Sequence, residues 1–112
     1  MSGFIAHDVA VQAATATLTA VQHVPHRHEP LADQCRRAAA SLALNVAEGH
    51  GRTGRDRVHH WRIAYGSARE ATVALDLLVA VAAVPPGPAQ AAATLLDRSR
   101  ALLWRAIQAA QR

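Results

Sequence analysis

Residues 34–70 read QCRRAAASLALNVAEGHGRTGRDRVHHWRIAYGSARE, and this stretch holds seven of the twelve arginines of the 112-residue chain. Within it, five polar residues follow one another at steps of three, four, four and three: Gln34, Arg37, Ser41, Asn45 and Glu48. This spacing puts all five on one face of a helix, where an amphipathic helix carries its apolar residues. The face therefore meets either water or a partner that forms hydrogen bonds with it.

The helix that follows the glycine loop is the expected partner of this polar row. If the chain folds back at the glycines, residues whose numbers sum to about 104–107 face each other. The facing polar residues are His59, Arg62, Ser67 and Glu70. Arg37 is then predicted to meet Ser67 or Glu70, Asn45 to meet His59 or Arg62, and Glu48 to meet His59. We expect Arg37 and Glu70 to form a partly buried ion pair that locks the two helices together.

The composition predicts an all-α protein. Alanine, the best helix former, supplies 27 residues, and strand-favouring residues are sparse. Breaks at Pro25, at the glycine loop and at 85–88 leave four helices: about 4–24, 31–48, 55–84 and 89–111. Because the connections are short, we expect one domain over 1–112, an antiparallel up-down-up-down four-helix bundle. An alanine-rich core buries little apolar area, which favours self-association.

Three glycines are given structural roles by their positions. Gly49 and Gly51 are predicted to end the second helix in the left-handed conformation that glycine accepts. Gly66 lies in the interior of the third helix, where glycine costs about 1 kcal/mol relative to alanine. We therefore expect another element to pack closely against Gly66.

The positive charge is concentrated in the middle of the chain. Residues 36–69 carry seven arginines against two acids, within a formal net charge of +4 for the whole chain. Such a surface attracts polyanions, although a solvated arginine face is the alternative. The GHGRTG loop and the positive end of the helix after it would accept a phosphate, unless the loop is a simple turn. The predicted nucleic-acid-binding residues are Arg52, Arg55, Arg57 and Arg62.

Catalytic and metal sites find no support in the sequence. Glu48 and Glu70 lie at opposite ends of the predicted hairpin, so they do not converge as an acid–base pair. Adjacent His59 and His60 point about 100° apart on a helix, which does not suit one metal ion. Cys35, the single cysteine, is interpreted as a packing residue, although neighbouring arginines would lower the pKa of its thiol. We expect no enzyme activity, no cofactor and no metal.

A cytoplasmic location is expected. The N-terminal MSGFIAHDVA lacks the basic and long apolar regions of a signal peptide. The longest uncharged apolar run, 77–84, is far shorter than the roughly 20 residues that span a bilayer.

The segments SLALNVAEGHGR and WRIAYGSAREA resemble the signature of the four-helix-bundle proteins encoded in bacterial 23S ribosomal RNA intervening sequences. The matching residues are Gln34, Arg37, Ala38, Ser41, Asn45, Ala47, Glu48, Gly49, Arg52, Ile63, Ala64, Gly66, Ser67 and Glu70. Leu42 and Val46 replace the usual isoleucines. The segment at His59, His60 and Trp61 departs from the phenylalanine- and leucine-rich pattern of that family.

The resemblance implies a four-helix bundle that assembles into a homopentameric ring, in a family whose role is mostly not established. It also extends to the accessory variability proteins of diversity-generating retroelements, which bind nucleic acid and a reverse transcriptase through a basic surface. Our leading hypothesis is a non-enzymatic homo-oligomer that binds RNA or DNA through arginines near the glycine loop. The alternative is a protein-interaction scaffold whose arginines serve subunit or partner contacts.

Overall fold

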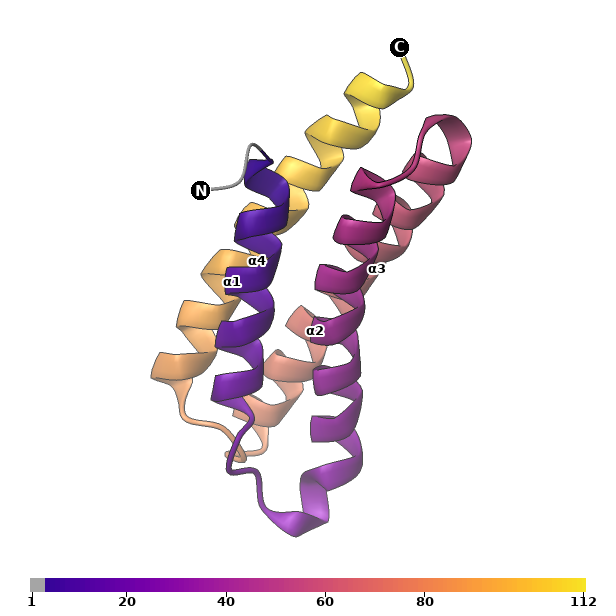
Figure 1. The fold of residues 1–112 in the computed structure, drawn as a ribbon. Coiled ribbons are helices and arrows are strands. Elements are labelled where there is room, and N and C mark those ends of the chain that lie inside the picture. The colour runs from indigo at the N-terminus through magenta and orange to yellow at the C-terminus, as the bar shows by residue number, and fades with distance from the viewer. Residues whose placement is uncertain (1–3) are drawn as a thin grey trace.

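The computed structural model describes residues 4–112, which form four α-helices and one short 3-10 helix. The helices are α1 (Ile5–Ala20), η1 (His26–His28), α2 (Glu29–His50), α3 (Gly54–Ala80) and α4 (Pro86–Ala110). Each α-helix packs against the next in the chain, and α4 packs against α1, so the four close into an antiparallel bundle (Figure 1). The predicted all-α four-helix bundle is confirmed.

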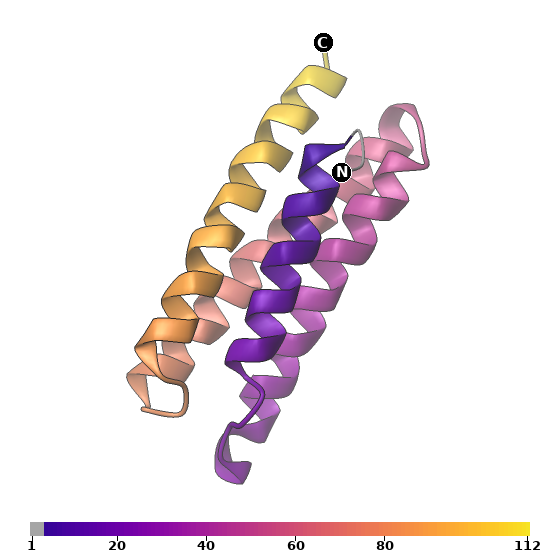
Figure 2. The same ribbon diagram turned by 60° about the vertical axis from the view of Figure 1, so that its left-hand side comes forward.

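The bundle is elongated, with extents of 44 × 24 × 19 Å. The α2–α3 turn and the C-terminus lie at one end, and the α1–α2 and α3–α4 connections lie at the other (Figure 1). In a turned view, α1 lies between α4 and α2, with α3 behind them (Figure 2). Helices α3 and α4 pack against each other, and residues of both border hollows along their shared face.

The core combines a thin alanine face with larger leucines. Helix α1 buries mainly alanines, together with Val9 and Thr17, and the Thr17 hydroxyl donates to the carbonyl oxygen of Ala13 (2.8 Å). The largest fully buried side chains are Leu42, Leu75, Leu78, Leu96 and Leu103. Small residues on α1 let its neighbours approach closely, while the leucines of the other helices supply most of the buried apolar area.

Helix bounds differ from the predicted ones where capping chemistry decides them. Helix α3 ends at Ala80, not near Val84, because Ala82 adopts a left-handed conformation (φ 58°). The amide of Ala83 donates to the carbonyl of Leu78 (2.8 Å), which closes the turn that commonly ends helices. Conversely, α4 begins at Pro86, because prolines fit the first helical turn, where an N–H has no partner.

The predicted roles of three glycines, Gly49, Gly51 and Gly66, were wrong. Gly51 has φ −81°, and among the described glycines only Gly54 has a positive φ, so glycine conformation does not end α2. A Cβ on buried Gly49 would lie 2.4 Å from the Trp61 indole, so its role is close approach. At Gly66, where close packing by another element was predicted, a Cβ would meet no atom within 4 Å.

Candidate functional site

The α2–α3 turn is built around the Trp61 indole. Trp61 is 5% exposed, packs on Gly49 and donates from Nε1 to the carbonyl oxygen of Val46 (3.4 Å). Phe4 stacks on both Trp61 and His50, with ring centroids 5.7 and 4.3 Å apart. These contacts hold the end of α2 against the first turns of α3, and so fix where the arginines of the loop lie.

Arg57 forms hydrogen bonds with the backbone of this turn. Its guanidinium donates from Nε to the carbonyl oxygen of Gly49 (3.0 Å) and from Nη2 to that of His50 (3.1 Å). It also lies 5.3 Å from the centroid of the Trp61 ring. A cation at the carbonyl end of a helix, over an aromatic face, is stabilised by both. Arg57 therefore caps α2 and is only partly available to a ligand.

Arg52 lies between two carboxylates. Its guanidinium contacts Asp56 at 2.7 Å and Glu48 at 3.3 Å. The hydrogen bond from Arg52 lowers the pKa of Asp56, and the same bond raises the pKa of Arg52. The two carboxylates thus largely neutralise the charge of Arg52 within the protein. A phosphate-binding residue requires a cation that is free of such partners.

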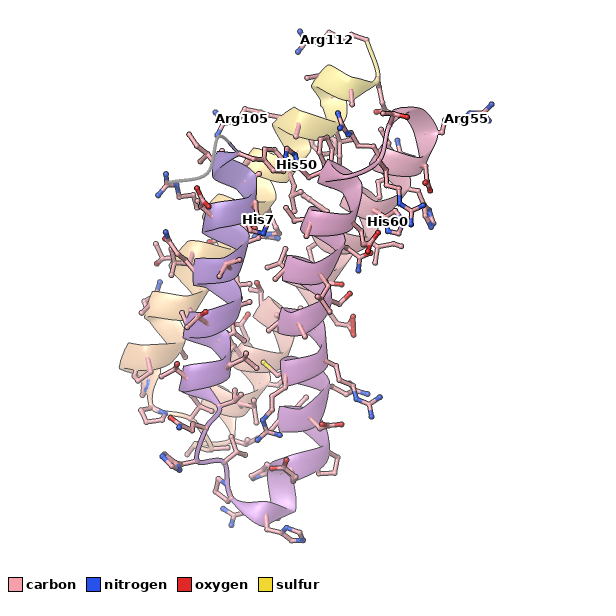
Figure 3. The ribbon with its side chains drawn as sticks, in the orientation of Figure 1. His7, His50, Arg55, His60, Arg105 and Arg112 are labelled. Carbon is pink, nitrogen blue, oxygen red and sulfur yellow. The ribbon has the colours of Figure 1, made fainter. Side chains whose placement is uncertain are left out.

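Arg55 and Arg62 are different, because both are exposed and neither forms a hydrogen bond or ion pair within residues 4–112. In Figure 3, Arg55 points away from the ribbon at the same end of the molecule as Arg112. Arg69 is also exposed, again with no such partner in the described part of the chain. Arg55, Arg62 and Arg69 are separated by steps of seven, so they follow one side of α3.

The polar row of α2 is docked only at its centre. The Ser67 hydroxyl donates to that of Ser41 (2.8 Å), and the Asn45 amide nitrogen donates to the Ser41 hydroxyl (3.1 Å). The Asn45 carbonyl oxygen pairs with His60 Nδ1 (3.0 Å), not with the predicted His59 or Arg62. This network joins α2 to α3 at mid-height.

The ends of that row are exposed, which corrects the prediction that all five residues pack on α3. Arg37 pairs with Asp33 on its own helix (3.0 Å), so the expected Arg37–Glu70 lock does not form. Glu48 contacts Arg52 and not His59, and Gln34 is exposed. The buried residues of α2 form a stripe through Cys35, Leu42 and Val46, and the polar row lies beside that stripe. Arg37 and Glu48 lie furthest from it around the helix and are therefore exposed.

The half-buried arginine of α2 is Arg36, which sequence reasoning did not single out. It donates to the Glu29 carboxylate and to the carbonyl oxygen of Val21 (3.2 Å). The Glu29 hydrogen bond raises the pKa of Arg36, and the same bond lowers the pKa of Glu29. Arg36 thereby ties the end of α1 to the start of α2.

The described part of the chain offers neither a cluster of metal ligands nor an exposed thiol. Across residues 4–112 no three histidine, cysteine or carboxylate side chains lie close enough to hold a metal ion. Cys35 is fully buried, and burial raises the pKa of its thiol to about 11, so the lowering expected from adjacent arginines does not prevail. Within the described residues, no helix is long and apolar enough to cross a bilayer.

An aromatic pair on the α3–α4 face was also missed. Tyr65 and Trp104 have ring centroids 6.2 Å apart, and Trp104 is 55% exposed. Helical spacing could have predicted that Trp104 is exposed, because it does not share a face with the buried residues of α4, which include Leu96, Ser99, Leu103 and Ile107. Arg69 was equally visible as the next member of the seven-residue series.

Comparisons with known proteins agree with this architecture. The family model described as 23S rRNA-intervening sequence protein matches residues 5–105. A solved structure from Bacteroides thetaiotaomicron VPI-5482, a protein of unknown function from the S23 ribosomal protein family, has a TM-score of 0.83 to this chain. It is 18% identical, over 93% of this chain and 96% of that one, which shows a shared fold alone. No curated protein matches the chain.

Proposed function

This chain belongs to the 23S rRNA-intervening sequence protein family, and we propose that it is a non-enzymatic, homo-oligomeric bundle that binds the backbone of RNA or DNA. The observation that carries the proposal is the row of exposed arginines on α3 without internal partners, Arg55 and Arg62 foremost. Guanidinium groups bind phosphates and release counterions from the nucleic acid. Arg52 and Arg57, already engaged by carboxylates and carbonyls, contribute less. A cytoplasmic location stays a prediction.

The test is salt-dependent binding of a labelled oligonucleotide, measured by fluorescence anisotropy. The double variant Arg55→Glu/Arg62→Glu is expected to weaken binding and to reduce the slope of log K against log salt by about two, one for each lost phosphate contact. The matched control is Arg27→Glu/Arg37→Glu, which changes the net charge equally at exposed positions outside α3. Equal binding by the two double variants, or binding that ignores salt, would contradict the proposal.

The alternative function, a scaffold for protein contacts, is favoured by a separate observation. Among the exposed large apolar side chains, four lie on α2 and α3: Leu44, Ile63, Val73 and Leu77. Exposed apolar side chains that share a surface indicate contacts with another protein surface. We assign these positions to subunit contacts in the homo-oligomer, for which the family resemblance implies five copies. A partner such as a reverse transcriptase remains part of this alternative.

A further inference from the structure

The α3–α4 groove carries an aromatic pair flanked by cations, away from the glycine loop. Tyr65 on α3 and Trp104 on α4 lie across the groove from each other, with rings inclined at 48°. Arg62 and Arg69 come three residues before and four residues after Tyr65, so they lie one helical turn to either side of it. Both guanidinium groups are therefore near the aromatic pair and are unpaired within the described residues.

Three hollows run along this groove. One of about 510 Å³ is bordered by Arg55 and Arg62 near the end of α4. The next, of about 370 Å³, is bordered by Arg62, Arg69 and Trp104, and shares Arg62 with the first. A third, of about 680 Å³, shares Tyr65 and Trp104 with the second. The aromatic pair therefore separates two hollows in a path that continues towards the α2–α3 turn.

Charge identifies the kind of occupant. The residues that border the three hollows include five arginines and a single acid, Asp97. That carboxylate is already paired with Arg100 (2.5 Å). The groove is thus strongly cationic, which suits a polyanion and opposes an apolar or basic protein surface.

Gly66 supplies an independent observation. It borders the 370 Å³ hollow in the interior of α3, where glycine is a poorer helix former than alanine. A Cβ at Gly66 would contact nothing within 4 Å, so packing inside the chain does not require a glycine there. The missing side chain leaves room beside Tyr65 and Trp104 for a group to approach the α3 backbone.

We propose that this groove binds single-stranded nucleic acid, with an unpaired base stacked on Trp104 and neighbouring phosphates held by Arg62 and Arg69. Aromatic stacking combined with a cationic track is how proteins bind unpaired strands, because every base exposes a π-face only when it leaves the duplex. A blunt duplex offers phosphates but no free base faces. The inference rests on the proposed function and adds to it a preference for single strands.

The test uses tryptophan fluorescence of the full chain, titrated with a short oligouridylate or with a blunt RNA duplex of equal length. The chain has two tryptophans, and Trp61 is buried while Trp104 is exposed. Oligouridylate is expected to quench the emission of the wild type. The Trp104→Phe variant, which keeps only Trp61, is expected to lose that quenching.

Affinity is measured separately by anisotropy. Trp104→Ala is expected to weaken oligouridylate binding by about 5- to 150-fold, the range for loss of one stacked base, and to leave duplex binding within about twofold. Gly66→Leu, which fills the hollow with a better helix former, is expected to weaken oligouridylate binding as well. The control Leu18→Ala removes an exposed apolar side chain from α1 and is expected to change neither oligouridylate binding nor duplex binding.

Three outcomes would overturn the inference. If Trp104→Ala and Gly66→Leu bind oligouridylate like the wild type while Arg55→Glu/Arg62→Glu does not, the groove proposal fails and the proposed function stands. If the arginine double variant also binds normally, both fail. If Trp104→Ala changes the molar mass found by light scattering, the groove is a contact between subunits and not a nucleic-acid site.

Discussion

Gly49 shows how one residue without a side chain sets the geometry of the α2–α3 turn. It lies within α2, directly beneath the Trp61 indole, and its carbonyl oxygen accepts a hydrogen bond from Arg57. The same approach brings His50 into the aromatic stack with Phe4. The residue that the sequence marked as a helix end is thus a contact point between two helices.

Gly49→Ala is expected to destabilise the fold, because the new Cβ would lie 2.4 Å from Trp61 Cδ1 and Nε1 and 3.1 Å from the Arg57 carbonyl oxygen. Overpacking of this kind costs about 1–3 kcal/mol, or about 4 °C in the thermal midpoint for each kcal/mol. Thermal unfolding followed by circular dichroism measures the change.

The matched control is Gly51→Ala. Gly51 has φ −81°, and its Cβ would lie 3.7 Å from the nearest atom, so alanine fits and is expected to leave the midpoint equal or slightly higher. An equal loss of stability in both variants would show that general glycine conformation, and not the approach to Trp61, explains the effect.

Helices α1 and α2 are joined by polar contacts as well as by packing. Arg36 on α2 reaches the carbonyl oxygen of Val21, just beyond α1, and the Glu29 carboxylate at the start of α2. On α3, Asp56 in the first turn holds Arg52 of the preceding loop. Each carboxylate thus fixes a connection between helices by accepting from a guanidinium group.

These contacts predict a weak acid sensitivity. The pKa values of Glu29 and Asp56 are lowered mainly by hydrogen bonds from Arg36 and Arg52. A carboxylate with a lowered folded-state pKa stabilises the protein above its ordinary pKa of about 4, and this stabilisation is lost as pH falls through the folded-state value. Both pairs are solvent-accessible, so salt screens the effect.

The thermal midpoint of the wild type is therefore expected to fall on acidification below about pH 4. The double variant Glu29→Gln/Asp56→Asn is expected to lose stability at neutral pH and to show a flatter profile on the acid side. Circular dichroism melts from acid to neutral pH measure both curves. A parallel shift of the whole profile, with no flattening, would contradict the assignment to these two groups.

The molecule as a whole exposes two unlike sets of side chains. The α3–α4 groove is cationic and aromatic, whereas Leu44 on α2 and Val73 on α3 are exposed apolar side chains, 65% and 57% exposed. A thin, alanine-rich core gives the single chain few other places to bury apolar area. We therefore assign the groove to the ligand and the exposed apolar residues of α2 and α3 to subunit contacts.

Self-association is expected to depend on the exposed apolar residues of α2 and α3. Leu44→Glu/Val73→Glu is expected to reduce the molar mass measured by light scattering towards the 11.9 kDa of one chain, because two buried charges would oppose assembly. The control Val11→Glu/Leu18→Glu places the same charges on exposed positions of α1. A wild-type protein that already scatters as a single chain would contradict the homo-oligomer.

Some of the candidate site was predictable from local patterns. The arginine-rich segment, the hairpin and the α2–α3 polar contact all follow from spacing, because helical periodicity decides which residues share a face. The hydrogen-bond and ion-pair partners of individual residues could not be predicted from this spacing. Arg37 was paired with Glu70 by register, but a carboxylate one turn away on its own helix, Asp33, was nearer.

Sequence alone determined the class of fold, the number of helices and the concentration of positive charge, since propensity, proline breaks and composition act locally. Tertiary structure decided which arginines remain free, because that depends on carboxylates and carbonyls brought together by packing. It turned Gly49 from a helix end into a contact with Trp61 and left Gly66 open to solvent. It also placed Trp104 beside Tyr65, 39 positions apart in sequence, because α3 and α4 lie side by side in the bundle.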